Sequence, residues 1–184
     1  MKAKSLIIGS LLFQAILLNA QKPLTLDVKS NMTITGTSTL HDWESDVTQI
    51  NLSGTGIEIN GKISEIRALT LTVPVKSIKS GKDLMDDKTL EALLAELYPT
   101  VKLSVESVHL FDGKISGKGN LTISGITKEV SLAATYSQTG STLEIKGTQN
   151  IDMLLYGVIP PKVLMGSIAT GKDITIPYHL IIHY

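Results

Sequence analysis

Residues 97–132 read LYPTVKLSVESVHLFDGKISGKGNLTISGITKEVSL, and their apolar side chains recur at every second position. This period is typical of a β-strand with one buried face and one solvated face. Asp112-Gly113 interrupts the alternation and suits a tight hairpin turn. The polar positions carry mostly Ser, Thr, Lys and Gly rather than clustered acids, histidines or thiols. The stretch therefore predicts paired antiparallel strands with little reactive chemistry.

The same alternation continues on both sides of this stretch. It predicts strands over residues 24–28, 32–35, 43–47, 50–59, 66–75, 101–109, 115–123, 129–136, 142–147 and 174–182. Short connections, such as Asn60-Gly61 and Gln138-Thr139-Gly140, favour hairpins between sequential neighbours. About eight such strands can close into a barrel, and a two-sheet sandwich is the alternative.

One segment has helical spacing instead. Leucines at 90, 93, 94 and 97 recur at the period of a helix, and Asp86 and Asp87 lie near its start, where negative charge suits the helix dipole. Pro99 ends the pattern, because the residue before a proline prefers extended geometry. We therefore expect one amphipathic helix within residues 83–98, with its leucine stripe packed against the end or wall of the barrel.

The N-terminus has the order of a secretory signal peptide. Lys2 and Lys4 precede an apolar run over residues 6–18, and Asn19-Ala20-Gln21 follows. We expect a signal peptide over residues 1–20 and a single domain over residues 21–184, located in the periplasm or secreted. The apolar run is too short for a comfortable membrane span of about 20 residues, so we expect no span. The chain has no cysteine, which excludes a lipoprotein anchor, disulfides and thiolate chemistry.

The charge balance argues against nucleic acid as a partner. The chain has 17 basic and 17 acidic residues, and no basic run is interleaved with aromatic residues. Binding to phosphates requires a basic footprint.

Candidate catalytic and metal-binding patterns all have simpler interpretations. His41-Asp42 resembles a catalytic pair, but neighbours on a strand point to opposite faces. On a strand, His179 and His183 would lie roughly 13 Å apart, too far to share one metal ion. Gly56 to Lys62 nearly matches a phosphate-binding loop, but Ile63 replaces the required Ser or Thr, so we interpret it as a hairpin turn. We expect no enzymatic activity, catalytic residue, metal or cofactor.

The inward face of the predicted strands is aliphatic, and aromatic residues are few. Such an interior suits a long flexible hydrocarbon better than a sugar or a cation. The same side chains would form a core if the sheet closes tightly, and Trp43 could also pack in that core. The candidate lumen residues are Met32, Ile34, Trp43, Leu69, Leu71, Val73, Val101, Leu103, Val105, Leu121, Ile123, Leu132, Ile176 and Tyr178.

Several motifs carry more specific information than the alternation. In chain order they are GTSTLHDW (36–43), SIKSG (77–81), MD (85–86) before the leucine-rich segment, YPTV (98–101), GNLTISGITK (119–128) and YGVIPP (156–161) with Gly166. Together they resemble the YceI-like family of exported lipid-binding proteins. The match spans essentially the whole chain after the signal peptide. In place of the family's usual Arg-Asp, this chain has Met85-Asp86.

The resemblance implies an antiparallel, lipocalin-like barrel of about eight strands with one helix packed on it. It also implies an isoprenoid or other lipid in the lumen, with its polar head towards the mouth, and members that are commonly dimeric. On this basis we expect an exported protein that sequesters or carries a long apolar ligand such as an isoprenoid or quinone. The alternative is a non-catalytic structural or interaction barrel whose lumen is filled by side chains and whose partners are proteins.

Overall fold

The structure of the protein, a computed structural model, describes residues 20–163 and 168–184. Residues 1–19 of the predicted signal peptide therefore lie outside the described residues. Over the described residues the fold is mainly β, with one α-helix, α1 (Asp83–Ala92), and two short 3-10 helices, η1 (Val75–Ser77) and η2 (Met153–Tyr156). No helix in the described part of the chain is long and apolar enough to cross a membrane.

The strands belong to one curled antiparallel sheet. Their order is β1-β5-β6-β8-β9-β10-β11-β13-β3-β4-β7, with β2 and β12 paired to β13. The longer strands are β3 (Asn31–Ser38), β4 (Trp43–Val47), β5 (Asn51–Ile59), β6 (Lys62–Pro74), β8 (Thr100–Phe111), β9 (Lys114–Ile123), β10 (Ile126–Thr139), β11 (Thr142–Asp152) and β13 (Ile168–His183). The short ones are β1 (Ala20–Pro23), β2 (Thr25–Leu26), β7 (Ile78–Lys79) and β12 (Lys162–Val163).

Tight turns explain why sequential strands pair. Asn60 and Gly61 have φ of 53° and 77°, Asp112 and Gly113 have 48° and 70°, and Ser124 and Gly125 have 46° and 78°. Two successive residues with positive φ match the right-handed twist of the flanking strands. The predicted hairpins at Asn60-Gly61 and Asp112-Gly113 are thus confirmed. The Gly-Lys pattern at 56–62 covers the end of β5, the turn at Asn60-Gly61 and the first residue of β6.

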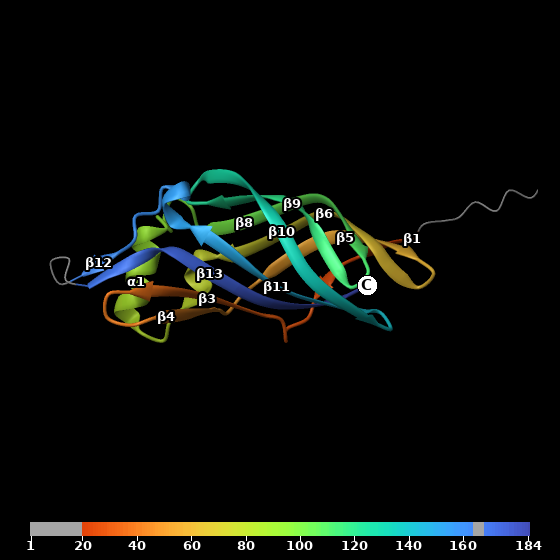
Figure 1. The fold of residues 1–184 in the computed structure, drawn as a ribbon, viewed down its shortest axis with the longest axis horizontal. Coiled ribbons are helices and arrows are strands. Elements are labelled where there is room, and N and C mark those ends of the chain that lie inside the picture. Colours follow the sequence, from red (N-terminus) through yellow and green to blue (C-terminus); the bar gives the residue numbers. More distant parts are fainter. Residues whose placement is uncertain (1–19, 164–167) are drawn as a thin grey trace, which may run out of the picture.

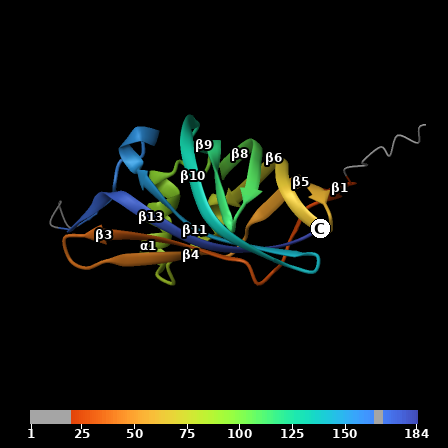
Figure 2. The same ribbon diagram turned by 45° about the vertical axis from the view of Figure 1, so that its right-hand side comes forward.

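Two bridging segments draw the sheet back onto itself (Figures 1 and 2). The N-terminal segment pairs first with β5 through β1 and then with β13 through β2. Past η1, the chain of β6 continues into β7, which pairs with β4. The mainly β, antiparallel class with one helix is confirmed. The estimate of about eight strands is slightly low, because these short bridging strands add to the longer ones.

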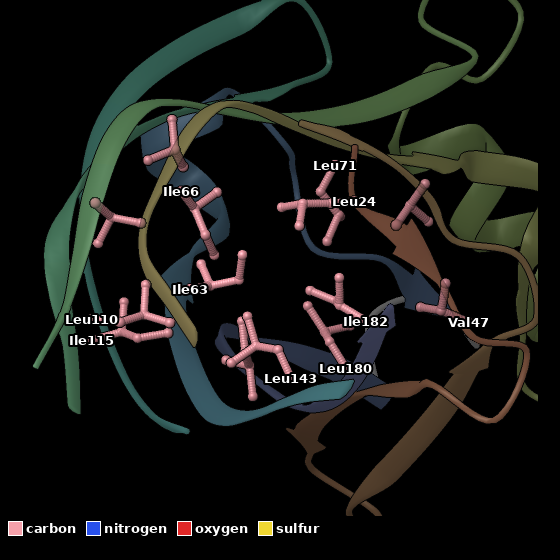
Figure 3. Close-up of a cluster of buried hydrophobic side chains, with 14 of the residues drawn as sticks. Leu24, Val47, Ile63, Ile66, Leu71, Leu110, Ile115, Leu143, Leu180 and Ile182 are labelled. Atoms are coloured by element: carbon pink, nitrogen blue, oxygen red, sulfur yellow. The ribbon is translucent and has the colours of Figure 1, made fainter. Parts of the chain in front are cut away.

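One end of the curled sheet is filled by the protein's own side chains. Figure 3 shows apolar residues from opposite walls pointing toward one another, including Ile63, Leu143 and Ile182, each at most 2% exposed. We call this set the first cluster; it also contains Leu24, Val47, Ile66, Leu71, Val73, Ile78, Val105, Val108, Leu110, Ile115, Ile145 and Leu180. A second cluster consists of Leu121, Ile123, Ile151, Tyr156 and Val158.

A side-chain amide fastens the same end across the interior. Gln138 Nε2 donates to the main-chain oxygen of Ile63 (2.9 Å), and Ile63 N donates to Gln138 Oε1 (2.8 Å). Gln138 is on β10 and Ile63 on β6, and two other strands separate these in the sheet. The hydroxyl of Tyr184 adds a bond to Gln138 Oε1 (3.2 Å). The amide therefore substitutes for a strand neighbour that the curled sheet cannot supply here.

The helix is shorter than the leucine spacing predicts. It ends at Ala92, and Leu94 takes a positive φ of 52°. Main-chain bonds within residues 90–98 then fold the chain into tight turns, including Tyr98 N to Leu94 O at 2.9 Å. Leu93 packs against both clusters, whereas Leu94 and Leu97 are 50% and 72% exposed. The predicted leucine stripe is therefore wrong for Leu94 and Leu97, because the helix ends before these residues and no longer directs their side chains to the buried face.

Candidate functional site

An open cavity lies beside α1 and borders the first cluster, with which it shares Ile78. It has a volume of about 330 Å³ and lies between α1, the strands β3, β4, β7 and β13, and the segment after η2. Figure 1 shows α1 beside these strands, at the end away from the C-terminus. The lining is mostly apolar: Ile34, Ser38, Leu40, His41, Trp43, Ser45, Ile78, Lys82, Leu84, Met85, Lys88, Thr89, Ala92, Leu93, Met153, Val158, Pro161, Ile168, Thr170 and Ile174.

The first wall is formed by β3 and β4. Gly36 pairs with Trp43, and the indole ring lies directly against the glycine. Trp43 Nε1 donates to the main-chain oxygen of Thr37 (3.1 Å), which fixes the ring in its plane. The absence of a side chain at Gly36 is what allows this arrangement. Trp43 therefore presents a fixed apolar surface to the cavity.

The loop between these strands forms one edge of the mouth. Ser38 Oγ donates to the main-chain oxygen of His41 (2.7 Å) and accepts from the main-chain nitrogens of Leu40 and His41 (both 3.3 Å). Leu40 is 66% exposed at this edge. His41 and Asp42 lie in the loop between β3 and β4, so the strand argument against a catalytic pair does not apply to them. His41 Nδ1 lies 2.7 Å from the main-chain oxygen of Asp42, so the contact involves no carboxylate.

The second wall is α1, which Asp86 anchors to the sheet. Asp86 Oδ1 accepts from the main-chain nitrogen of Ser80 (2.8 Å) and from its hydroxyl (2.7 Å), and Oδ2 lies 3.3 Å from Lys79 Nζ. The hydrogen bonds from Ser80, with a smaller contribution from Lys79, hold the pKa of Asp86 below its ordinary value. A neighbouring side of the helix, with Met85 and Ala92, lines the cavity.

The chain after α1 is held by the hairpin between β9 and β10. Ser124 Oγ donates to the main-chain oxygen of Leu93 (3.0 Å). The ring of Tyr98 lies against Gly125, where a Cβ would come within 2.7 Å of Tyr98 Cζ. Thr122 and Thr127 share a hydroxyl contact of 2.8 Å beneath the turn. The GNLTISGITK motif thus positions the end of the helix that covers the cavity.

The third wall is the segment from η2 to β12. Asp152 Oδ1 accepts from Leu154 N (2.9 Å) and caps η2, while its Oδ2 lies 2.7 Å from Lys172 Nζ. Tyr156 and Val158 are buried in the second cluster, and burial raises the pKa of the Tyr156 phenol. Ile159, between the lining residues Val158 and Pro161, is 77% exposed. Gly166, which belongs to the same predicted motif, lies outside the described residues.

The structure divides the predicted lumen residues between the cavity and the two clusters. Ile34 and Trp43 line the cavity. Leu71, Val73 and Val105 are members of the first cluster, and Leu121 and Ile123 are members of the second. The remaining predicted residues are half-buried and pack against these clusters; they are Met32, Leu69, Val101, Leu103, Leu132, Ile176 and Tyr178.

Strand alternation alone did not identify the helix and loop residues that line the cavity. Met85, Thr89 and Ala92 come from α1, and Met153 and Pro161 come from the segment after β11. The motifs at 36–43, 85–86 and 156–161, however, meet around this cavity. Their convergence is the signal that could have located it.

Two further histidines, His179 and His183, have carboxylate neighbours on the sheet. His179 Nε2 lies 3.1 Å from Glu144 Oε2, and His183 Nε2 lies 2.8 Å from Asp27 Oδ2. Within residues 20–163 and 168–184, no group of three or more His, Cys, Asp or Glu side chains is arranged to hold a metal ion.

Comparisons with known proteins are consistent with this geometry. The family model described as "YceI-like domain" matches residues 31–181. Burkholderia cenocepacia BcnA is 19% identical with a TM-score of 0.71, and the match covers 85% of this chain and 99% of that one. A polyisoprenoid binding domain from Saccharophagus degradans, implicated in plant cell wall breakdown, is 12% identical with a TM-score of 0.63, covering 87% and 97%.

A third solved structure, the Campylobacter jejuni YceI protein, is 15% identical with a TM-score of 0.60; the match covers 100% of this chain and 91% of that one. At these identities the likeness establishes the fold alone. A search of curated proteins finds no match.

Proposed function

Because the chain belongs to the YceI-like domain family, as its motifs predicted, we propose that it binds a long apolar ligand, such as an isoprenoid, a quinone or a similar lipid. The observation that carries this proposal is the cavity of about 330 Å³ with an apolar lining and an open mouth. Small-molecule sites have volumes of about 300–1,000 Å³. The polyisoprenoid binding named for the Saccharophagus domain supports the same ligand class.

The binding energy comes mainly from removal of hydrocarbon from water. Each buried CH₂ group contributes about 0.8 kcal/mol, so a chain of several carbons binds well without polar specificity. Trp43, Met85 and Leu93 supply flat or flexible apolar surface around such a chain. Methionine in particular adapts to irregular shapes.

The ligand occupies the α1 end of the sheet. The first cluster fills the other end, and its residues Ile63, Leu143 and Ile182 leave no room for a chain there. A ligand longer than the cavity extends through the mouth, over the exposed side chains of Leu40 and Leu84. The protein is then a carrier or sequestering protein without catalytic activity.

Export supports this role. The signal-peptide pattern of residues 1–20 predicts a periplasmic or secreted protein. An apolar molecule that crosses an aqueous compartment needs a cover of this kind, since its exposed hydrocarbon is unfavourable in water.

The filled end also favours the second candidate function, a barrel with structural or interaction roles. A barrel of this kind needs no ligand, because its own side chains occupy the interior. The two candidates differ in what the cavity at α1 does, so a test must alter this cavity without altering the first cluster.

Substitution of Ala92 by Trp provides that test. Ala92 is half-buried on α1 and lines the cavity, so a large ring there blocks it. The matched control is Ala133→Trp, at an exposed position of β10. We expect the fluorescent apolar probe phenylnaphthylamine to bind the original protein and the control, and to lose at least tenfold in affinity for Ala92→Trp. Equal binding to all three proteins would place the apolar site elsewhere and favour the filled barrel.

A further inference from the structure

The inner end of the cavity carries a hydroxyl group that has no hydrogen-bond partner among the described residues. On β4, Trp43, Ser45 and Val47 face inward, while Glu44 and Asp46 are exposed. Trp43 and Ser45 line the cavity, and Val47 belongs to the first cluster. Ser45 therefore lies where the open cavity meets the filled end, and its side chain is only 3% exposed.

Among the buried polar residues of the described chain, Ser45 differs from the other two. Ser77 Oγ donates to the main-chain oxygen of Pro74 (2.7 Å), and Glu65 accepts from Arg67 (2.7 Å). The Ser45 hydroxyl has no hydrogen bond to residues 20–163 or 168–184. In this part of the chain, every side-chain oxygen or nitrogen that is fully shielded from solvent has a hydrogen-bond partner. The Ser45 hydroxyl is thus open to the cavity rather than enclosed by protein.

Three other polar groups on the lining are already used within the protein. Ser38 bonds to the loop, Thr89 Oγ1 donates to the main-chain oxygen of Met85 (2.9 Å), and Trp43 Nε1 donates to Thr37. The hydroxyl of Thr170 also has no hydrogen bond among the described residues, but Thr170 is only half-buried and pairs with Ser38 at the loop edge of the cavity. Buried polar groups in proteins nearly always have a partner, because an unpaired one costs free energy. The free hydroxyl of Ser45 therefore points to a partner that enters the cavity from outside.

We propose that the ligand carries a neutral oxygen, such as that of a ketone, quinone or alcohol, that reaches the inner end of the cavity and bonds to Ser45. This inference rests on the proposed function. The lysines on the lining, Lys82 and Lys88, belong to α1 and its cap at the mouth, and Lys88 lies 2.7 Å from Glu91. A charged group at the inner end would meet apolar neighbours such as Ile34 and Ile78 and lose its hydration. The ligand thus enters the cavity with its polar group first. This orientation is the reverse of the one implied by the family resemblance, in which the polar head lies towards the mouth.

The test compares two probes of equal carbon number, decyl methyl ketone and dodecane, as competitors of phenylnaphthylamine. The measured quantity is the ratio of the two affinities in the original protein and in Ser45→Ala. The hydration of each free probe is the same in both measurements and cancels when the two proteins are compared. A change in the ratio therefore reports on the Ser45 hydroxyl. Ser131→Ala is the matched control, since it removes the hydroxyl of an exposed serine of β10 outside the cavity lining.

We expect Ser45→Ala to weaken ketone binding about fivefold to tenfold, the size of one hydrogen bond, and to leave dodecane binding within about twofold. The Ser131→Ala variant keeps the original ratio. An unchanged ratio in Ser45→Ala would overturn the inference and assign the hydroxyl to a water molecule. If neither probe displaces the dye from the original protein, the proposed function fails, and the inference with it. Circular dichroism of each variant confirms that the comparison is made on folded protein.

Discussion

The indole ring of Trp43 lies against Gly36 on the paired strand, so that a Cβ at residue 36 would approach Trp43 Cε2 to 2.7 Å. This wall of the cavity thus depends on the glycine at position 36, which leaves room for the ring, as much as on the indole of Trp43. This relationship also makes Trp43, the single tryptophan of the chain, a reporter of the site.

Gly36→Ala should displace the indole. Overpacking of this kind typically costs about 1–3 kcal/mol of unfolding free energy. We expect a shift in tryptophan emission together with weaker binding of an apolar probe, measured on the same sample. An emission spectrum identical to that of the original protein would show that the ring does not rest on Gly36.

Gln138→Leu should destabilise the filled end without affecting the cavity. It leaves the main-chain nitrogen and oxygen of Ile63 without the bonds that Gln138 provides, and each unsatisfied buried group costs about 1–3 kcal/mol. Denaturant unfolding measures this loss, and probe binding should remain within about twofold because the two ends are separate. Gln149→Leu is the control, since its amide donates to the main-chain oxygen of the neighbouring Asn150 and does not connect separate strands. Similar stability of both variants would argue against the bridge.

Acidification should release α1. The pKa of Asp86 lies below its ordinary value, so the ionised carboxylate stabilises the fold. This contribution is complete above the unfolded pKa of about 3.9 and is lost as the pH falls through the lower folded value. We expect probe binding to be insensitive to Asp86 between about pH 7 and 5 and to fall below about pH 4.

Asp86→Ala should reproduce the acid effect at neutral pH. Hydrogen exchange of residues 83–92 should become faster, because the anchor to Ser80 and Lys79 is gone. Asp87→Ala, at an exposed position of the same helix, serves as the control. Unchanged exchange in Asp86→Ala would mean that other contacts hold the helix.

Period-two alternation was enough to predict most of the sheet, because one buried face per strand is a local property. Residues 43–47 form β4 as expected, and residues 115–123 form β9 within one residue. The end of the helix was not predictable from spacing, since the positive φ of Leu94 depends on tertiary contacts such as that between Ser124 and Leu93. The short strand β7 is likewise defined only by its partner β4.

The site was less predictable than the fold. Alternation reports which face of a strand a side chain occupies, and it gives the same pattern for Leu71, which is in the first cluster, and Ile34, which lines the cavity. The difference arises from position along the sheet relative to α1, which is a long-range property. Ser45 is the clearest example. From the sequence, a serine at an inward position could be bonded within the core or could face a cavity, and only its neighbours in the structure decide between the two.

Leu71→Ala and Met85→Ala should therefore have opposite effects. Leu71 is 8% exposed in the first cluster, so its truncation should cost about 2–5 kcal/mol of stability. Met85 lines the cavity from α1, so its truncation should weaken the binding of an apolar probe with little change in stability. Calorimetric unfolding and probe titration of both variants measure the two effects. Loss of binding without loss of stability in Leu71→Ala would move the ligand into the first cluster.

The central claim is that the cavity beneath α1 holds an apolar molecule in the cell. Its most direct test is mass spectrometry of the protein isolated from its native cells without detergent, before and after organic extraction, alongside Ala92→Trp isolated in the same way. We expect a discrete apolar molecule with a neutral oxygen to accompany the original protein and to be absent from the variant. A folded protein that carries no bound mass, or the same mass in both proteins, would contradict the claim.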